Sequence, residues 1–307
     1  MKDSDVQRHV DDLERQCLES LDPFAHFVLL DSVDTFNPLP FAISDKITGE
    51  TISDHPISDV IRLSESKRQD SVKALKRVFR YFSSETLVLM LLSGRPLGPF
   101  VRLSNVLRGK KLDDTFKSIA RKEVPEGFAL KFEGQPLSFE KWISERITAD
   151  PDWLSENGSG QIADLIVEEA AMLSNRGTIN AFKHCRPFSH ANSPEVVATP
   201  KDGERRPLNE TLNGINWMEW KENQDTITLS YLSEEIEDGH DQQRLFSIGL
   251  LLDSLKRLRL AQLGGAVENF ELILPTDMKT GLRVRHQKIA IKYASSENVE
   301  TLHGANE

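Results

Sequence analysis

Apolar residues recur along much of this chain at steps of three and four residues, the spacing of one face of an α-helix. In residues 3–21 the stripe begins at Val6, and Asp22-Pro23 ends the helix. Ser138 is placed to cap a helix that runs through residues 142–147. The same spacing predicts further helices over residues 24–33, 65–82, 85–92, 101–107, 113–121, 161–175 and 242–263.

Alternating apolar and polar positions predict a smaller amount of β-structure, mainly near the C-terminal end. Short strands are predicted over residues 128–132 and 226–232. Residues 270–274 and 282–293 alternate around a turn and predict a closing β-hairpin. Three segments lack a clear helical or strand pattern. We expect a loop with one short strand over residues 45–59, a polar exposed loop over residues 189–210 and an acidic solvated turn over residues 234–241. The fold class is therefore mainly α with minor β, with bundle-like helical regions and a C-terminal hairpin.

A chain of 307 residues is long enough for two ordinary domains. The clearest boundary signals are Asp150-Pro151 and the Gly- and Ser-containing residues 157–160. We therefore expect a helical N-terminal region over residues 1–150, which contains a basic central block. A helical plus β domain is expected over residues 151–307.

Composition and missing motifs narrow the function classes. The chain opens with a charged helix instead of an export signal, and no apolar run approaches the roughly 18 residues of a membrane span. We expect a cytoplasmic protein without membrane contact, in which Cys17 and Cys185 are free thiols. Phosphate loops, dinucleotide fingerprints, zinc-protease motifs and serine-hydrolase motifs are all missing. No cofactor and no metal site are therefore expected.

The charge of the chain is unevenly distributed. The formal net charge is −10, yet residues 62–122 contain fifteen Lys and Arg against five Asp and Glu. Such a block either binds an external polyanion or is neutralised by the chain's own carboxylates. For the first alternative, Arg80 and Tyr81 are expected to be an exposed pair. The candidate nucleic-acid-binding residues are Arg68, Lys73, Lys76, Arg77 and Arg80.

The segment from residue 176 to residue 184 is the strongest candidate for chemistry. If it is helical, Arg176, Asn180 and His184 share one face at i, i+4 and i+8. That face prolongs an inward stripe that includes Glu169. Buried polar groups need partners, so one interpretation is a structural network. In the other, His184 acts as acid or base while Arg176 or Lys183 holds a phosphate.

These residues resemble the signature helix of HEPN (higher eukaryotes and prokaryotes nucleotide-binding) domains. Asn180 and His184 match the family's polar residue and histidine, whereas Ile179 stands where the family's arginine would precede Asn180. The resemblance implies a helical bundle, often dimeric, in a family with many metal-independent ribonucleases of RNA processing and phage defence. The departure at Ile179 implies a non-catalytic relative.

Three functions follow as alternatives. The leading one is a binding or regulatory protein of a bacterial defence system that acts through protein or RNA contacts, without catalysis. The second is a HEPN-like ribonuclease with His184, Asn180, Arg176 and Lys183 as catalytic residues. The third is a dimeric scaffold, because the helix over residues 242–263 is so apolar on one side that its own core or a partner must bury it.

Overall fold

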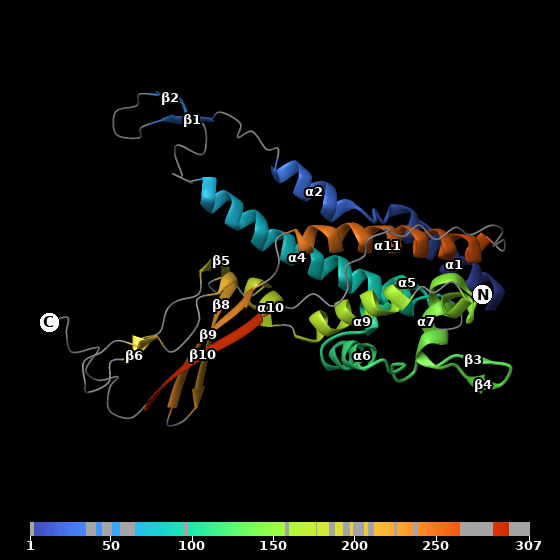
Figure 1. The fold of residues 1–307 in the computed structure, drawn as a ribbon. Helices are drawn as coiled ribbons and strands as arrows, with labels where there is room; N and C mark the ends of the chain where they lie inside the picture. Colours follow the sequence, from blue (N-terminus) through green and yellow to red (C-terminus); the bar gives the residue numbers. More distant parts are fainter. Residues whose placement is uncertain are drawn as a thin grey trace. The chain divides into compact units, whose positions relative to one another are not determined.

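The computed structural model describes residues 3–34, 41–44, 51–55, 65–94, 98–156, 160–175, 177–183, 188–192, 197–198, 206–207, 212–223, 226–235, 239–264 and 285–294. Its helices are α1 (Asp3–Ser20), α2 (Ala25–Asp34), α4 (Glu65–Leu92), α5 (Phe100–Val106), α6 (Lys110–Ala120), α7 (Phe139–Thr148), α8 (Trp153–Glu156), α9 (Gly160–Ser174), α10 (Gly177–Lys183) and α11 (His240–Gly264). Its strands are β1 (Phe41–Ser44), β2 (Thr51–His55), β3 (Lys131–Phe132), β4 (Gln135–Pro136), β5 (Phe188–Asn192), β6 (Val197–Ala198), β7 (Arg206–Pro207), β8 (Asn213–Asn223), β9 (Thr226–Glu235) and β10 (Arg285–Ala294). The prediction of a mainly α fold with minor β is confirmed (Figure 1).

The chain divides into two compact units that interleave along the sequence. Unit 1 consists of Met1–Val28, Val78–Arg176 and Asp238–Leu282. Unit 2 consists of Leu29–Arg77, Gly177–Glu237 and Arg283–Glu307. Each unit draws on both sides of residue 150, so the units do not coincide with the expected domains 1–150 and 151–307.

Unit 1 consists mainly of helices and also contains the short strand pair β3 and β4. Within it α6 packs against α9, and α11 contacts both α1 and α7. Helix α7 begins as predicted, because the Ser138 side chain accepts a hydrogen bond from the backbone N–H of Lys141. Trp142 is fully buried behind this cap and donates its indole N–H to the carbonyl of Phe128 at 2.8 Å. The cap and the buried indole thus fix where α7 starts and which face it buries.

The apolar face of α11 is covered within the monomer. Leu251, Leu252, Leu255 and Leu258 are all buried at 2% exposure or less. Of the two ways to bury this face, a core of its own or a dimer seam, the structure uses the first. The apolar stripe of α11 therefore gives no support to the dimeric scaffold.

Helix α4 is one continuous helix of 28 residues, whereas the sequence pattern predicted two helices separated at Ser83-Ser84. Both serines are buried. The Ser84 hydroxyl donates to the carbonyl of Arg80 at 2.7 Å, one turn earlier in the same helix. This bond satisfies the hydroxyl inside the helix, so the pair of serines does not interrupt it.

Unit 2 contains an antiparallel sheet in the order β10-β9-β8-β5 (Figure 1). Helix α10 contacts β8, and a small core forms where Ala74 of α4, Ala181 of α10 and Trp217 of β8 meet, together with Ile215. Alternate residues Ile215 and Trp217 of β8 thus face this core, whereas further along the strand both faces are exposed, at Trp220 and Lys221.

The polar-loop prediction needs correction. The loop expected over residues 189–210 contains β5, which pairs with β8, and the short pair β6 and β7. Cross-strand pairing, which local pattern does not reveal, decides this case.

The closing hairpin is described only in its second arm. This arm is present as β10, which pairs with β9 over ten residue pairs. The expected first arm, residues 270–274, lies outside the described residues, so the pairing of the two arms stays a prediction.

Gly214 in β8 offers a test of this sheet. A Cβ at this position would lie 2.2 Å from the carbonyl oxygen of Glu234 in the neighbouring strand β9. The Cβ is fixed to the backbone of β8 and the carbonyl oxygen belongs to the backbone of β9. Because these two backbones are paired, neither atom can move aside. We expect Gly214→Ala to lower the free energy of unfolding by about 2 kcal/mol or more. Gly160→Ala is the control, because nothing lies within 4 Å of its Cβ position. Urea unfolding of both variants measures the difference, and equal stabilities would contradict the pairing of β8 with β9.

Candidate nucleic-acid interface

The half of the basic block that lies in α4 is largely internal. Arg77 is 1% exposed, and its Nη1 lies 2.6 Å from the Glu234 carboxylate in β9. Lys73 and Lys76 are half-buried, and the side chain of Arg68 lies outside the described residues. The interpretation that the chain's own carboxylates neutralise the block therefore holds for Arg77.

Arg80 is the centre of a larger buried network in unit 1. It is 4% exposed, and it donates two hydrogen bonds to the fully buried Glu169 of α9, from Nε at 2.9 Å and from Nη2 at 2.8 Å. Its Nη1 donates to Asp241 of α11 at 2.9 Å. The Ser84 hydroxyl also lies 2.7 Å from the Glu169 carboxylate, so its one proton is shared between this carboxylate and the Arg80 carbonyl. The expectation that Arg80 and Tyr81 are exposed is wrong, because Tyr81 is 1% exposed and also turned inward.

The acidic turn expected over residues 234–241 supplies two of these carboxylates. Glu234 belongs to β9 and is buried against Arg77, and Asp241 begins the first turn of α11 and binds Arg80. The prediction of a solvated turn is therefore wrong for both residues. Their cationic partners lie far away in sequence, so spacing alone could not identify them.

The electrostatics of the network follow from burial and charge. Burial opposes ionisation of Glu169, but the charge and hydrogen bonds of Arg80, the charge of Arg244 and the Ser84 hydroxyl outweigh it and lower the pKa of Glu169. Burial likewise opposes the charge on Arg80, and Glu169 and Asp241 raise its pKa all the same. Both groups stay ionised in the interior.

His240 precedes Asp241 of the same network, but unlike Glu169 and Arg80 it is not charged. It is buried, and burial followed by the charge of Arg80 lowers its pKa to about 4, against opposition from Asp241. His240 is therefore neutral at physiological pH. A neutral imidazole adds no further positive charge beside Arg80 and Arg244.

The other half of the basic block is exposed on α5 and α6. From residue 102 to residue 122 the chain has seven basic and two acidic residues. Arg121 and Lys122 pair with Glu123 and Asp164 at 3.2 and 3.3 Å. The remaining five are exposed, and within the described part of the chain none of them forms an ion pair. We call these five the α5–α6 basic segment: Arg102, Arg108, Lys110, Lys111 and Lys117.

The fold of α6 explains why this segment faces solvent. Leu112, Phe116 and Ile119 bury one face of the helix, which leaves Lys110 and Lys117 outside. Gly109 precedes the helix with φ +55°, and no side chain caps its first turn. Two lysines therefore stand at a helix N-terminus, where the helix dipole favours anions over cations. The sequence already indicated a cluster of cations here, because these residues belong to the same basic block, residues 62–122, as Arg77 and Arg80.

The segment with the HEPN resemblance is helical over Gly177–Lys183, as α10. Asn180 is half-buried and Lys183 is exposed, while Ile179 and Ala181 are buried. Arg176 and His184 lie outside the described residues. The helix expected for this segment is present, and the structure describes two of its four candidate catalytic residues.

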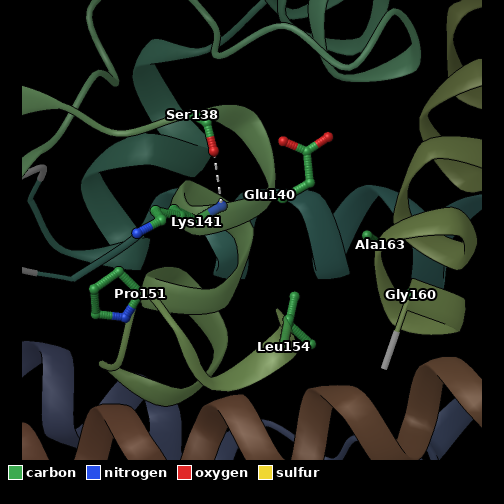
Figure 2. A pocket seen from close by; sticks show the side chains of 7 residues that line it. All are labelled: Ser138, Glu140, Lys141, Pro151, Leu154, Gly160 and Ala163. Carbon is green, nitrogen blue, oxygen red and sulfur yellow. Dashed lines mark hydrogen bonds between the residues drawn. The ribbon is translucent and has the colours of Figure 1, made fainter. Parts of the chain in front are cut away.

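A mainly apolar pocket of about 480 Å³ lies at the start of α7 and α9 in unit 1 (Figure 2). Its charged lining residues are Glu140 and Lys141, whose side chains point in different directions. Lys141 is engaged by Asp152 at 2.7 Å, and this hydrogen bond raises its pKa. The two charged groups therefore do not act on a common point, and the pocket has no acid–base arrangement.

Metal-binding and membrane-spanning features are absent from the described residues. Among them, no group of three or more His, Cys, Asp or Glu side chains is placed to hold a metal ion. The described helices include none that is both long enough and apolar enough to span a membrane.

Glu169 tests the buried network directly. In Glu169→Gln, Arg80 keeps its buried position but loses the carboxylate that compensates its charge. We expect the free energy of unfolding to fall by about 3 kcal/mol, because one ion of a buried pair is left uncompensated. Glu123→Gln is the matched control, since Glu123 pairs with Arg121 at the surface and its side chain is 57% exposed. We expect less than about 1 kcal/mol there. Equal losses in urea unfolding would contradict the assignment.

His240 predicts a dependence of stability on pH. An unfolded histidine takes up a proton near pH 6.5, whereas in the folded chain the pKa of His240 is about 4. Between these values the unfolded state binds more protons, so stability falls as the pH falls. The shift corresponds to at most about 3 kcal/mol. Unfolding free energies at pH 7 and pH 5 should therefore differ less in His240→Gln than in the wild type. An unchanged difference would refute this role for His240.

Comparisons with known proteins add nothing to this geometry. No protein-family model, no curated protein and no solved structure matches the chain. The function is therefore argued from the chain's own residues, of which the α5–α6 basic segment is the most accessible charged group described above.

Proposed function

We propose that this protein binds RNA through the α5–α6 basic segment and acts as a binding or regulatory protein, without catalysis. The observation that supports the proposal is the presence of five exposed cations without ion-pair partners among the described residues, in a chain of net charge −10. Carboxylates are plentiful in this chain, and elsewhere they neutralise Arg77 and Arg80. Asp113 and Asp114 lie in the same helix α6, yet the five cations form no ion pair within the described part of the chain, which suits them to an external polyanion.

The spacing of the segment suits a phosphate backbone. Arg108, Lys110 and Lys111 lie within four residues, at the turn between α5 and α6. The Arg108 guanidinium donates to the side-chain carbonyl of Asn105 at 2.9 Å, which orients it. Lys117 follows two turns after Lys110 on the exposed face of α6. Backbone contacts of this kind give affinity without sequence preference and depend strongly on salt.

The test is binding of a 20-nucleotide single-stranded RNA, measured by fluorescence anisotropy at several salt concentrations. Lys110→Glu/Lys111→Glu should weaken binding about tenfold or more, because two phosphate contacts become repulsive. The slope of log K against log salt should become less steep by roughly 1.5, which corresponds to two lost contacts.

The control is Lys221→Glu/Lys288→Glu, which changes the net charge equally at exposed positions of β8 and β10. RNA binding by this variant should stay close to that of the wild type. If both double variants lose the same affinity, overall charge and not the α5–α6 basic segment is responsible. If the wild type does not bind RNA at low salt, the proposal fails. Equal affinity for DNA of the same sequence would remove RNA as the preferred ligand.

A second candidate function is a metal-independent, HEPN-like ribonuclease. The observation in its favour is that the segment with the resemblance forms helix α10, with Lys183 exposed near its end. In this proposal His184 assists attack of a ribose 2′-hydroxyl on the adjacent phosphate, and Arg176 or Lys183 stabilises the negative charge. Asn180 would position the reacting groups.

The two candidates are separated by cleavage of the same RNA on a gel, with EDTA present. A ribonuclease would produce fragments in the wild type and not in His184→Ala, with the melting temperature unchanged. Binding without fragments in either protein supports the non-catalytic proposal. Fragments that persist in His184→Ala would exclude His184 as the catalytic base.

A further inference from the structure

A second, larger pocket lies in unit 1, and no residue of α10 lines it. Its volume is about 810 Å³, within the range of small-molecule sites. Helix α1, the start of α5, the end of α11 and the bridge between Gly94 and Gly98 surround it. The pocket therefore collects side chains from segments that are far apart in sequence.

Arg259 of α11 is the buried cation of this pocket. It is 3% exposed, and it has no ion-pair partner among the described carboxylates. Its Nη2 donates to the carbonyl of Arg146 at 2.8 Å and its Nη1 to the side-chain oxygen of Gln262 at 3.1 Å, while Nε has no hydrogen-bond partner. A Cβ on Gly94 would lie 2.8 Å from Nε, so this approach requires a glycine.

The charge of Arg259 is poorly compensated. Burial, followed by the neighbouring charge of Arg146, lowers its pKa to about 9, and the more distant Glu145 and Glu14 oppose this shift only in part. The Glu14 carboxylate is already used, since it accepts the N–H groups of Phe100 and Val101 at 2.6 and 3.2 Å. Arg259 therefore remains charged at neutral pH, with neutral acceptors in place of an anion.

The side-chain oxygen of Gln262 occupies a position beside Arg259 where an anion would form a stronger hydrogen bond. A carboxylate oxygen accepts a charge-assisted hydrogen bond, which is roughly twice as strong as one to a neutral amide. Gln262 is half-buried at the pocket, so its side chain can turn away without leaving a buried group. A ligand carboxylate can therefore replace it beside Arg259.

The remaining lining defines the rest of the ligand. Leu13 and Val101 are 48% and 39% exposed and line the pocket together with Val10, Pro99 and Leu263. An apolar body would cover these side chains. Asp11 and Glu14 also line the pocket and would repel a dianion such as phosphate more strongly than a monoanion.

We propose that this pocket binds a small monocarboxylate with an apolar body, whose carboxylate replaces Gln262 at Arg259. Arg102 of the α5–α6 basic segment also lines the pocket, but the proposal is argued from Arg259 and does not rest on RNA binding. It adds a small-molecule ligand to the proposed function, held by α1, α5 and α11.

The test uses Gln262→Glu, which places a carboxylate of the chain itself beside Arg259. Octanoate, octanol and inorganic phosphate are the probes, and isothermal titration calorimetry measures binding. Octanoate should bind the wild type about tenfold or more tighter than octanol and phosphate do. In Gln262→Glu octanoate binding should fall about tenfold or more, and the melting temperature should rise. The rise would occur even though a negative charge near a helix C-terminus is otherwise unfavourable.

Gln243→Glu is the control, with the same substitution at an exposed position of the same helix. It should bind octanoate as the wild type does. Equal affinity for octanol would show an apolar cavity only and would overturn the role of Arg259. Tighter binding of phosphate would overturn the carboxylate assignment. No binding of octanoate to the wild type, or equal binding to Gln262→Glu, would overturn the site.

Discussion

The ion pair between Arg80 and Glu169 is the interaction on which unit 1 depends most. Both side chains are buried, and each stays charged because the network supplies opposite charges, since taking an ion out of water costs several kcal/mol. The pair joins α4 to α9, and Asp241 extends it to α11. Three helices that are separated in sequence must therefore meet in one arrangement for the charges to be compensated. Apolar packing supplies the bulk of the stability, and this network restricts which packing is acceptable.

The same requirement explains why one basic block has a buried part and an exposed part. Arg77 in unit 2 and Arg80 in unit 1 are both buried, so each needs a carboxylate from its own unit, and Glu234 and Glu169 provide one. Helix α6 buries only one face, so Lys110 and Lys117 reach water and form no ion pair within the described part of the chain. The number of cations in a segment therefore says little about function. What matters is whether the fold brings a carboxylate to each of them.

The sequence pattern predicted the parts of this fold that are decided locally. Helices α1, α9 and α11 follow from apolar spacing, and Ser138 from cap chemistry. Strand β8 was missed, because about half of its residues are polar and its pairing partners lie elsewhere in the sequence. The interleaving of the two units could not be predicted from the sequence either, since no local pattern indicates which distant segments share a core. The exposure of Arg80 was predicted wrongly because the α4 stripe was treated as the helix's single buried face.

One sequence signal could have located the network. Glu169 stands within an apolar stripe of α9, and a carboxylate in such a position requires a cation from another segment. Arginine is the best suited cation, because its planar group binds both carboxylate oxygens at once, as Arg80 does here. A buried acid in a stripe therefore predicts a buried arginine. Arg259 differs from Arg80, because it is a buried arginine without an ion-pair partner among the described carboxylates. An arginine whose carboxylate comes from the chain forms a structural pair, whereas one that lacks such a carboxylate is suited to an anion from a ligand.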